Sequence, residues 1–501
     1  MSARPDSGPI VVIGGSIAGL TSALLFARTG RQVVLVERDP ATAAARLAGL
    51  AGRDVPARRT TPQSDHSHIF LARLRLLLAE RAPDALAALV AHGVRELALR
   101  DGLPPGLVGV DHPALDDPAL VALAARRTTI EEALRAVVLA EPGVVQRSGA
   151  AAHDLVVEGP SDAGPATVRG VVFADGSALG AGLVVDASGR RTAVPGWLAA
   201  RGVAADVESA ECGISYLSRF YRAHDGCIDP PLTRGFTAGG SFDGWSCLVF
   251  PGDDGTFSVT FGILPEDRGM RALAASGPAF DAAVAAIPSL APWTDPAHAA
   301  PITGVATMSG LKNMVRRYVD PATGEPSVLG LATVGDAAAT GNPAHSRGCT
   351  VAAVHAAAIA DAVAAHGDDP VALAAALDDV MVCQVRPWVQ DSVDQDAVRL
   401  ARWRPGTPPA PAPAPDRLTN GELYAAAQSD PELWRTFSRL QNMLHLPAEV
   451  LADAATVTAV RDGTFPSPPG VDAPSRPELL ALAAGADARP GRRRRQVAPA
   501  P

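Results

Sequence analysis

The chain has 501 residues, 47% of them hydrophobic, which is enough to bury a large core in two or three packed domains. Its net charge of −9, with Lys312 as the single lysine, gives no support to nucleic-acid binding. The five cysteines are widely spaced and odd in number, which indicates a reducing compartment and no structural metal site. The short polar start and the lack of an apolar run of about 18 residues predict a cytoplasmic protein without a signal peptide or membrane span.

The first predicted element is a strand over 10–13, whose unbroken apolar sequence is typical of a parallel strand buried on both faces. Gly14 allows a tight turn after it, and a helix follows as far as Gly30. Gly19 lets that helix pack closely on the strand, so that the helix N-terminus can offer free N–H groups to a pyrophosphate. A second strand ends at Glu37. This order of elements predicts a dinucleotide-binding βαβ unit; the alternative is a plain βαβ unit with a glycine-rich turn.

Two side chains in this unit bear on which dinucleotide it takes. Glu37 can accept ribose hydroxyls and would repel a 2′-phosphate, which favours FAD or NAD over NADP. Ser16 stands where the middle glycine of the fingerprint is expected, and we interpret it as a variant that adds a hydroxyl donor. The predicted cofactor contacts in this unit are Gly14, Ser16, Ile17, Ala18, Gly19, Glu37 and Arg38.

In the middle of the chain the predicted secondary structure changes from helices to an antiparallel sheet. Residues 64–100 are expected to be helical from their three- and four-residue apolar spacing, and a further helix is expected over 128–140, followed by short strands up to Val185. From 205 to 300, alternating or continuous apolar runs separated by turns predict an antiparallel sheet inserted into an α/β scaffold. Its aromatic residues, Trp245 and Trp293 among them, fit either a ligand-facing wall or ordinary core packing.

The last third returns to the first pattern. A buried parallel-type strand is expected over 328–334 and a long alanine-rich helix over 350–366. Residues 404–415 are rich in proline and predict an extended linker, and a helical region follows over about 417–460. The tail 486–501, with four consecutive arginines, is expected to be disordered and solvated.

One late segment identifies a family. Gly335 and Asp336 end the predicted late strand, and a loop containing Pro343 and Gly348 leads into the long helix. Together with the N-terminal unit, this resembles the FAD-dependent monooxygenase and hydroxylase superfamily, of the para-hydroxybenzoate hydroxylase type. In that family the aspartate binds the ribitol chain of FAD, and the loop and helix N-terminus face the pyrimidine side of the flavin, where they stabilise negative charge. The resemblance therefore adds Gly335, Asp336, Pro343, Gly348 and Cys349 to the predicted FAD contacts; the alternative is an ordinary aspartate-capped turn.

Two further segments resemble motifs of the same family. Asp186 ends a strand as in the family's middle motif near the FAD pyrophosphate, but the form Asp-Ala-Ser-Gly puts any NAD(P)H contact in doubt and leaves Arg190 and Arg191 as either contacts or parts of a simple turn. Arg127 begins a helix that looks like the family's Arg-x-x-Leu-Glu segment, whose arginine approaches the FAD phosphates or the flavin edge. A solvated Arg127 at a helix start is the alternative.

Histidines near these motifs are the remaining candidates. His66 and His68 resemble a Pro-Gln-x-x-His-x-His segment found in a subset of the family; two imidazoles do not make a metal site, so packing or hydrogen bonding near the flavin is expected. His345 and Arg347 lie in the flavin loop and are the catalytic candidates, with a structural role for His345 as the alternative. No metal is expected.

The resemblance implies an α/β fold with a Rossmann-like FAD-binding domain, an inserted antiparallel-sheet substrate domain and a helical C-terminal region. The expected limits are 8–204 with 301–390 for the discontinuous FAD-binding domain, 205–300 for the substrate domain and 391–485 for the helical region.

The implied function is that of a FAD-dependent oxidoreductase. Monooxygenation is the main expectation: reduced flavin and O₂ would give a C4a-hydroperoxide that hydroxylates or epoxidises a medium-sized apolar molecule of secondary metabolism. Because no second nucleotide fingerprint is visible, NAD(P)H would act transiently or through a separate flavin reductase. The alternatives are a dehydrogenase or reductase on a polyketide or isoprenoid, a non-catalytic flavin-binding protein and a flavin halogenase. The last is disfavoured because the chain has no Trp-x-Trp-x-Ile-Pro segment and Lys312 comes late.

Overall fold

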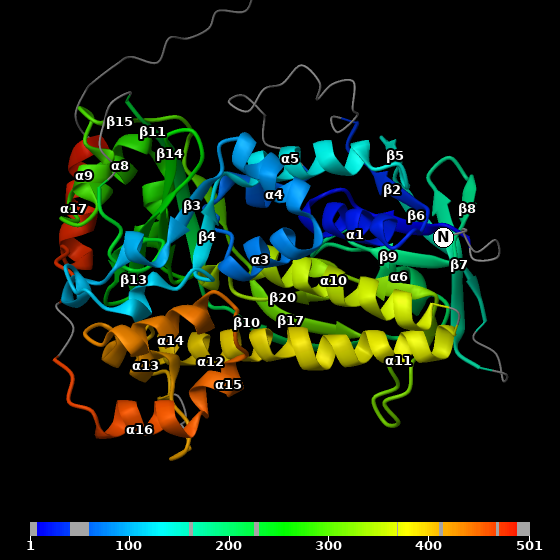
Figure 1. Cartoon of the computed structure of the whole chain (residues 1–501). Coiled ribbons are helices and arrows are strands. Elements are labelled where there is room, and N and C mark those ends of the chain that lie inside the picture. The colour runs from blue at the N-terminus through cyan, green and yellow to red at the C-terminus, as the bar shows by residue number, and fades with distance from the viewer. Residues whose placement is uncertain are drawn as a thin grey trace, which may run out of the picture.

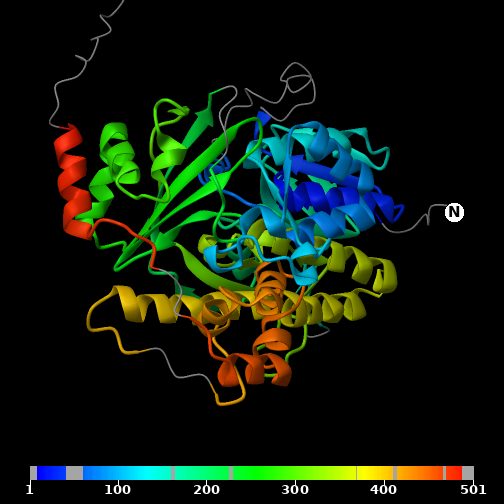
Figure 2. The ribbon, with the colours of Figure 1, turned by 60° about the vertical axis from the view of Figure 1, so that its left-hand side comes forward.

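The structure is a computed structural model that describes residues 8–40, 60–159, 164–224, 230–367, 369–409, 414–466 and 470–487. A parallel sheet lies at one end of the molecule and a larger antiparallel sheet at the other (Figures 1 and 2). The helices between residues 370 and 462 pack along one side of both sheets, and the last helix, over 476–487, lies at the outer end of the antiparallel sheet. This arrangement confirms the predicted α/β class with an added antiparallel sheet and a helical C-terminal region. The domain limits stay a prediction.

The parallel sheet has the strand order β19-β9-β1-β2-β5, and every pairing in it is parallel. All four residues of β1 are buried, as its unbroken apolar sequence requires. Ile13 pairs with Asp186, and Asp186 pairs with Thr333, so that three strands end at the same edge of the sheet. The strands are β1 (Ile10–Ile13), β2 (Val33–Glu37), β5 (Val144–Ser148), β9 (Leu183–Asp186) and β19 (Leu331–Thr333).

Helices cover this sheet. Helix α1 (Ile17–Arg28) packs between α10 (Gly348–His366) and α5 (Arg127–Ala140), which confirms the helix predicted over 128–140. Of the described helices, α10 alone is long and apolar enough to cross a membrane, but 67% of its apolar window is buried inside the fold. Because α1, α3 and α11 pack against it, α10 has the surroundings of a core helix.

The predicted strand over 328–334 is broken into two. Gly330 adopts a φ of +69°, and a Cβ there would lie 2.3 Å from the carbonyl oxygen of Val168, so that only glycine fits. The chain thereby steps from one sheet to another. Strand β18 (Val328–Leu329) joins a small sheet with β6 (Ala152–Glu158), β7 (Ala166–Phe173) and β8 (Ala178–Gly180), whereas β19 joins the parallel sheet.

The antiparallel sheet has the order β12-β13-β14-β11-β15, with β16 also paired to β11. Trp245 and Trp293 are buried in its core against Phe261 and Phe257 respectively, so these two tryptophans are packing residues. The strands are β11 (Ser215–Ala223), β12 (Ala238–Ser241), β13 (Trp245–Pro251), β14 (Thr256–Ile263), β15 (Ala299–Pro301) and β16 (Ala306–Met308). A separate sheet joins β10 (Asp206–Glu211), β17 (Lys312–Arg317) and β20 (Ala339–Thr340).

The expectation of helix throughout 64–100 is wrong at both ends. A 3₁₀ turn, η3 (Pro62–Asp65), precedes an extended segment, and the helical part is divided into α3 (Ala72–Arg81) and α4 (Pro83–Ala91). Gly93, with a φ of +87°, ends the helical pattern, and β3 (Arg95–Ala98) then pairs with β4 (Val121–Ala124). Apolar spacing alone could not reveal this strand because its partner lies more than twenty residues later in the chain.

The C-terminal region is helical, as predicted for 417–460. The helices there and before it are α11 (Pro370–Val380), the π-helical turn η10 (Met381–Val385), α12 (Arg386–Trp403), α13 (Asn420–Ala427), α14 (Pro431–Gln441), α15 (Pro447–Leu451), α16 (Ala454–Asp462) and α17 (Arg476–Asp487). Short helices elsewhere are α6 (Val194–Ala199), α7 (Arg268–Arg271), α8 (Gly277–Ala285), α9 (Ala291–Thr294) and the 3₁₀ turns η8 (Gly335–Ala337) and η9 (Pro343–His345). Of the predicted tail 486–501, the residues from 488 on lie outside the described residues.

Candidate functional site

The turn between β1 and α1 is built for close backbone approach. Gly14 has a φ of +106°, and a Cβ on Gly19 would lie 1.7 Å from the carbonyl oxygen of Gly14. Ser16 is the N-cap residue of α1, but its hydroxyl does not cap the helix, and no acidic residue lies in the first turn. The N–H groups of Ile17 and Ala18 therefore stand at a positive helix end that no side-chain carboxylate of that turn neutralises. Such an end is suited to an anion.

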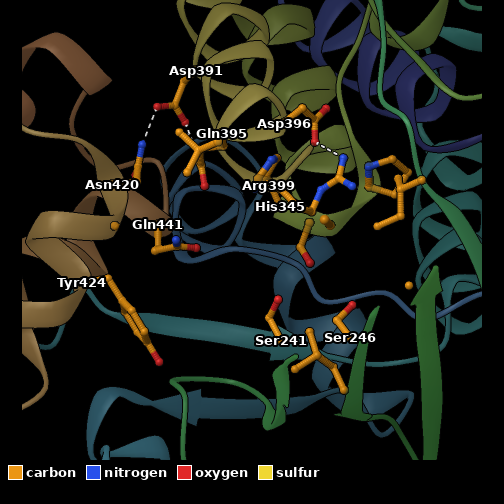
Figure 3. Close-up of a pocket in the computed structure, with 18 of the residues that line it drawn as sticks. Ser241, Ser246, His345, Asp391, Gln395, Asp396, Arg399, Asn420, Tyr424 and Gln441 are labelled. Atoms are coloured by element: carbon orange, nitrogen blue, oxygen red, sulfur yellow. Dashed lines mark hydrogen bonds and ion pairs between the residues drawn. The ribbon is translucent and has the colours of Figure 1, made fainter. Parts of the chain in front are cut away.

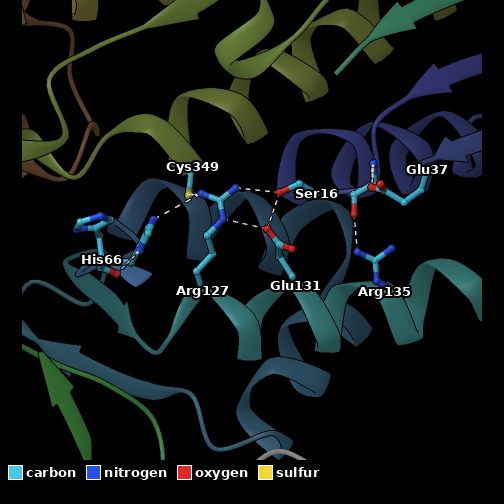
Figure 4. Close-up of polar contacts among 9 residues, drawn as sticks. Ser16, Glu37, His66, Arg127, Glu131, Arg135 and Cys349 are labelled. Carbon is cyan, nitrogen blue, oxygen red and sulfur yellow. Dashed lines mark hydrogen bonds and ion pairs between the residues drawn. The ribbon is translucent and has the colours of Figure 1, made fainter. Parts of the chain in front are cut away.

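Arg127 lies at this turn (Figure 4). Its guanidinium donates to Ser16 Oγ at 2.9 Å and to Glu131 Oε1 at 2.9 Å, while Ser16 Oγ donates to the same carboxylate at 2.5 Å. Its Nη1 lies 3.5 Å from Cys349 Sγ, at the start of α10. Burial opposes the charge, but Cys349 and Glu131 raise the pKa of Arg127 above its ordinary value. The structure thus brings Ser16, Arg127 and Cys349 together, and Arg127 is not a solvated helix start.

Glu37 lies beside the same turn. Its two carboxylate oxygens accept from the backbone N–H of Gly15 at 2.9 Å and of Asp39 at 2.8 Å, and Arg135 donates to the carbonyl of Gly15. Glu37 is buried at the end of β2, whereas Arg38 points outward and is exposed. A carboxylate oxygen is the kind of acceptor that a ribose hydroxyl needs.

Asp186 ends β9 and is fully buried. Its carboxylate accepts from the Ser188 backbone N–H at 3.0 Å, from Ser188 Oγ at 2.5 Å and from Thr192 Oγ1 at 2.6 Å. Burial raises its pKa, and these hydrogen bonds oppose the rise. All the hydrogen bonds described for this carboxylate are within its own turn, so Asp186 fixes the shape of the chain beside the β1 turn.

Asp336 follows β19 at the same sheet edge. Burial raises its pKa, while Arg127, Arg190 and a hydrogen bond from Gln63 oppose that rise. Arg191, next to Arg190, is exposed. Gly335, at a φ of +59°, packs where a Cβ would come within 2.9 Å of the Ala18 side chain, which ties this turn to the first turn of α1.

The loop between Pro343 and Gly348 leads into α10. Gly348 is exposed and no other residue approaches the position of its Cβ within 4 Å, so the N-terminus of α10 is open. Arg347 points elsewhere: its Nη1 lies 2.6 Å from Asp391 Oδ2, both side chains are at most 5% exposed, and its guanidinium carbon lies 4.9 Å from the ring centroid of Trp388. This placement favours a role in fixing the loop against α12.

A cavity of about 780 Å³ lies between the antiparallel sheet, this loop and helices α12 to α14 (Figure 3). His345 lines it, and its Nε2 atom is buried with no hydrogen-bond partner among the described residues. Burial and then the charge of Arg347 lower the pKa of His345 to about 4, so its imidazole is neutral at physiological pH. His345, unlike Arg347, thus reaches the cavity.

His66 and His68 face in different directions. His66 lines the cavity, and its Nδ1 lies 2.9 Å from Ser218 Oγ, which in turn lies 2.7 Å from Thr260 Oγ1. His68 Nδ1 lies 2.9 Å from the His66 carbonyl, and its Nε2 lies 3.5 Å from Arg127. Burial lowers the pKa of His66 to about 4 and of His68 to about 3. The alternating spacing of the two histidines therefore places one at the cavity and one beside Arg127, at the turn after β1.

Most of the cavity lining was not found from the sequence. Tyr216 donates to Asn342 Oδ1 at 2.5 Å, and Asn342 donates to Asp396 Oδ1 at 2.5 Å, which ties the sheet, the loop and α12 together. Helices α12 to α14 contribute polar residues to the wall that no motif marked. Within the described ranges, no group of three or more His, Cys, Asp and Glu residues is placed to hold a metal ion.

Comparisons with known proteins place this fold. No family model matches the chain, and no curated protein matches its sequence. Among solved structures, PqsL of Pseudomonas aeruginosa, a probable FAD-dependent monooxygenase, is similar over 79% of this chain and 97% of its own, with 18% identity and a TM-score of 0.55. A flavoprotein/dehydrogenase from Cytophaga hutchinsonii covers 96% of this chain and 98% of its own, with 15% identity and a TM-score of 0.56.

The myxobacterial chondrochloren halogenase CndH, a FAD-dependent halogenase, is also similar, with 18% identity, a TM-score of 0.53 and coverage of 96% of this chain and 97% of its own. At these identities the likeness establishes the fold and leaves the reaction open. The chain therefore shares the fold of a probable FAD-dependent monooxygenase, a flavoprotein/dehydrogenase and a FAD-dependent halogenase.

Proposed function

We propose that the chain binds FAD and is a FAD-dependent monooxygenase acting on a small organic molecule held in the 780 Å³ cavity. The observation that carries the proposal is that the predicted cofactor-binding segments come together in the fold. The turns after β1, β9 and β19 meet at one sheet edge, and the open N-terminus of α10 lies between that edge and the cavity loop. Three segments that are remote in sequence would thus form the dinucleotide site, and the loop from Pro343 to Gly348 would connect that site to the cavity.

Each predicted contact has a part in this proposal. Gly14, Ser16, Ile17, Ala18 and Gly19 would face the pyrophosphate, where glycine permits close approach and the helix end favours an anion. Glu37 would accept ribose hydroxyls, with Arg38 at the outer rim. Arg127 would approach the phosphates or the flavin edge through its fixed fork of donors.

The ring end would lie at the later motifs. Asp336 would bind the ribitol chain, with Gly335 allowing the close contact to α1. Pro343, Gly348 and Cys349 would face the pyrimidine side, where the positive end of α10 favours negative charge. Asp186 would act by holding its turn in shape. When bound, FAD supplies the redox chemistry, with electrons from NAD(P)H directly or through a separate reductase and with O₂ as oxidant.

The residues of the chain itself would hold the substrate and exclude water. The neutral His66 engages Ser218 through Nδ1, which leaves Nε2 to exchange a hydrogen bond or proton with a molecule in the cavity. The buried Arg347–Asp391 pair would keep the loop that carries His345 fixed against α12. A rigid, closed wall is what an oxygen-transfer reaction needs to avoid wasteful release of peroxide.

Dehydrogenation without oxygen transfer is the second candidate, because a flavoprotein/dehydrogenase is as similar in fold as PqsL. Halogenation has less support. Lys312 is 55% exposed in its side chain and pairs with Glu211 at 3.0 Å on the separate sheet of β10, β17 and β20, and it does not line the cavity.

Oxygen-18 labelling tests the proposal. The compound that accumulates when the gene is deleted would be incubated with the FAD-loaded protein, NAD(P)H, a flavin reductase and ¹⁸O₂, first without and then with added chloride or bromide. One labelled oxygen atom in the product supports monooxygenation. An unlabelled product supports the dehydrogenase, and a halogenated product supports the halogenase. A protein that neither retains nor takes up FAD would contradict all three.

A further inference from the structure

The cavity contains more positive charge than its own carboxylates neutralise. Four arginines line it, and two of them are paired: Arg399 with Asp396 at 2.8 Å, and Arg417 with Asp394 at 4.0 Å. The third carboxylate of the wall, Asp391, forms an ion pair with Arg347, which does not line the cavity. The other two lining arginines are Arg234 and Arg402.

Neither Arg234 nor Arg402 has a carboxylate within ion-pair distance among the described residues. Arg402, on α12, donates to the hydroxyl of Ser241 on β12, and the guanidinium carbon of Arg234 lies 5.2 Å from the ring centroid of Tyr424. Both side chains line the same cavity, Arg402 as an exposed residue and Arg234 as a partly exposed one. Burial and then the like charge of Arg234 lower the pKa of Arg402, and Asp243, which is also exposed, opposes that effect. Two guanidiniums that line one cavity are stabilised when an anion in that cavity binds them.

The space next to these arginines is apolar. The cavity wall includes Ile214, Leu248, Phe250, Met308, Phe437 and Leu451. Arg234 also lines a smaller adjoining pocket of about 180 Å³, which shares Leu248, Phe250 and His345 with the cavity. A ligand that fills this space would therefore place apolar atoms on the sheet and the helices and could place one charged group at Arg234 and Arg402.

We propose that the cavity binds an amphipathic anion, a molecule with an apolar body and a single carboxylate or equally acidic group, and that Arg234 and Arg402 bind that group. This inference sharpens the substrate expected from the sequence, which was apolar with no stated charge. It rests on the proposed function only for the reaction that follows binding. The anion site itself depends only on Arg234 and Arg402.

Two fluorescent probes with the same aromatic skeleton test the site. 8-Anilinonaphthalene-1-sulfonate carries one negative charge, and N-phenyl-1-naphthylamine is its neutral counterpart. We expect the sulfonate to bind the full chain more tightly, and the neutral probe to displace it because both fill one cavity. Arg234→Gln and Arg402→Gln should each weaken sulfonate binding about tenfold and change binding of the neutral probe less than twofold, because one charge-assisted hydrogen-bonding partner is lost in each.

The controls separate the site from general surface charge. Arg435→Gln removes a partly exposed arginine that pairs with Glu432 on α14 and does not line the cavity, and it should leave both affinities unchanged. Arg402→Lys should recover part of the sulfonate affinity because it keeps the charge and loses the planar fork. Equal binding of the two probes, equal loss of both in the variants, or sulfonate that the neutral probe cannot displace would each overturn the assignment.

The same titrations with and without FAD distinguish this inference from the proposed function. Charge-selective binding in a protein that takes up no FAD would retain the anion site and refute the oxidoreductase. Normal FAD uptake with no preference for the charged probe would refute the anion site and leave the proposed oxidoreductase standing.

Discussion

The turn after β1 and the cavity beneath the antiparallel sheet are built on different principles. At the turn, glycines decide the geometry: a Cβ on Gly19 would lie 1.7 Å from a backbone oxygen of Gly14, five residues earlier. At the cavity, charged and polar side chains decide it. Asp391 on α12 meets Arg347 from the loop, and His66 meets Ser218 on β11, 152 residues away.

The difference shows where each region is vulnerable. Backbone packing at the turn leaves no room for an added side-chain atom, but substitution of the polar side chains around the turn should change stability little. The cavity wall has room for many side chains, but it depends on buried charges that lose their compensation when one partner is removed. The following predictions test this contrast, from the largest expected effect to the smallest.

Removing the charge from Arg347 should have the largest effect on stability. Arg347→Met leaves Asp391 buried without its ion-pair partner, and we expect a loss of about 3–5 kcal/mol in the free energy of unfolding by urea at pH 7. Arg169→Met is the control: it breaks the pair with Glu158, whose side chains are 55% and 67% exposed, and should cost less than about 1 kcal/mol.

The same pair has a pH signature. In the wild type, Arg347 and a further hydrogen bond outweigh burial and lower the pKa of Asp391. A lowered folded-state pKa gives stability that is present above the ordinary aspartate pKa and is lost as the pH falls through the lower value. Arg347→Met should therefore lose less stability than the wild type on acidification over that range. Equal losses at every pH would contradict the ion-pair explanation.

A single methyl group at Gly19 should be nearly as damaging. Gly19→Ala forces a backbone shift at the turn, and we expect a loss of about 2–3 kcal/mol together with weaker FAD retention. Gly196→Ala, in α6, is the matched control, because nothing lies within 4 Å of the position that its Cβ would take and alanine suits a helix. If both variants unfold alike, close backbone approach does not constrain the turn.

Buried neutral histidines should make stability depend on pH. Burial lowers the pKa of His355, on α10, to about 4, so that the unfolded chain binds its proton first as the pH falls. The stability from this group is complete above about pH 6.5 and is lost towards pH 4, by up to about 1.4 kcal/mol per pH unit. Urea unfolding at several pH values should show a shallower loss for His355→Leu than for the wild type, whereas exposed His153→Leu should keep the wild-type slope.

The smallest effect is expected at Ser16. Its hydroxyl accepts from Arg127 and donates to Glu131, so Ser16→Gly removes hydrogen bonds worth about 1 kcal/mol and should change FAD affinity a few-fold. Ser16→Ala separates loss of the hydroxyl from added backbone freedom. FAD affinity is measured by fluorescence titration of the apoprotein. A change in product identity in either variant would contradict the placement of Ser16 at the AMP half of the cofactor.

Patterns local in sequence predicted the fold well. The βαβ unit, the late Gly335-Asp336 turn and the helix from Gly348 all occur where expected, because a buried strand, a tight turn and a helix start are each dictated by neighbouring residues. The strand β3 was missed because its hydrogen bonds are made to β4 and not to neighbours in sequence. The break in the predicted strand at Gly330 was missed because the residue that approaches Gly330 there, Val168, lies on another strand.

For the candidate site, too, the sequence predicted which residues belong to it, and only the tertiary structure showed where their side chains point. The sequence indicated His345 and Arg347, two residues apart, as catalytic candidates, with a structural role as the alternative for His345. In the tertiary structure His345 lines the cavity, and it is Arg347 that forms a buried ion pair, with Asp391. His66 and His68 were likewise indistinguishable until Ser218 and Arg127 were seen on either side of them. The direction of a side chain depends on partners that come from distant segments, and no spacing rule contains them.

The sequence by itself thus determined that a parallel sheet carries a glycine-rich turn and ends in acidic turns at one edge, since backbone conformation and apolar periodicity are local properties. Only the tertiary structure decided which charges remain unpaired. Arg234 and Arg402 are two arginines among many in the sequence, and they become a candidate anion site because folding pairs the other lining arginines with carboxylates and leaves these two beside an apolar cavity.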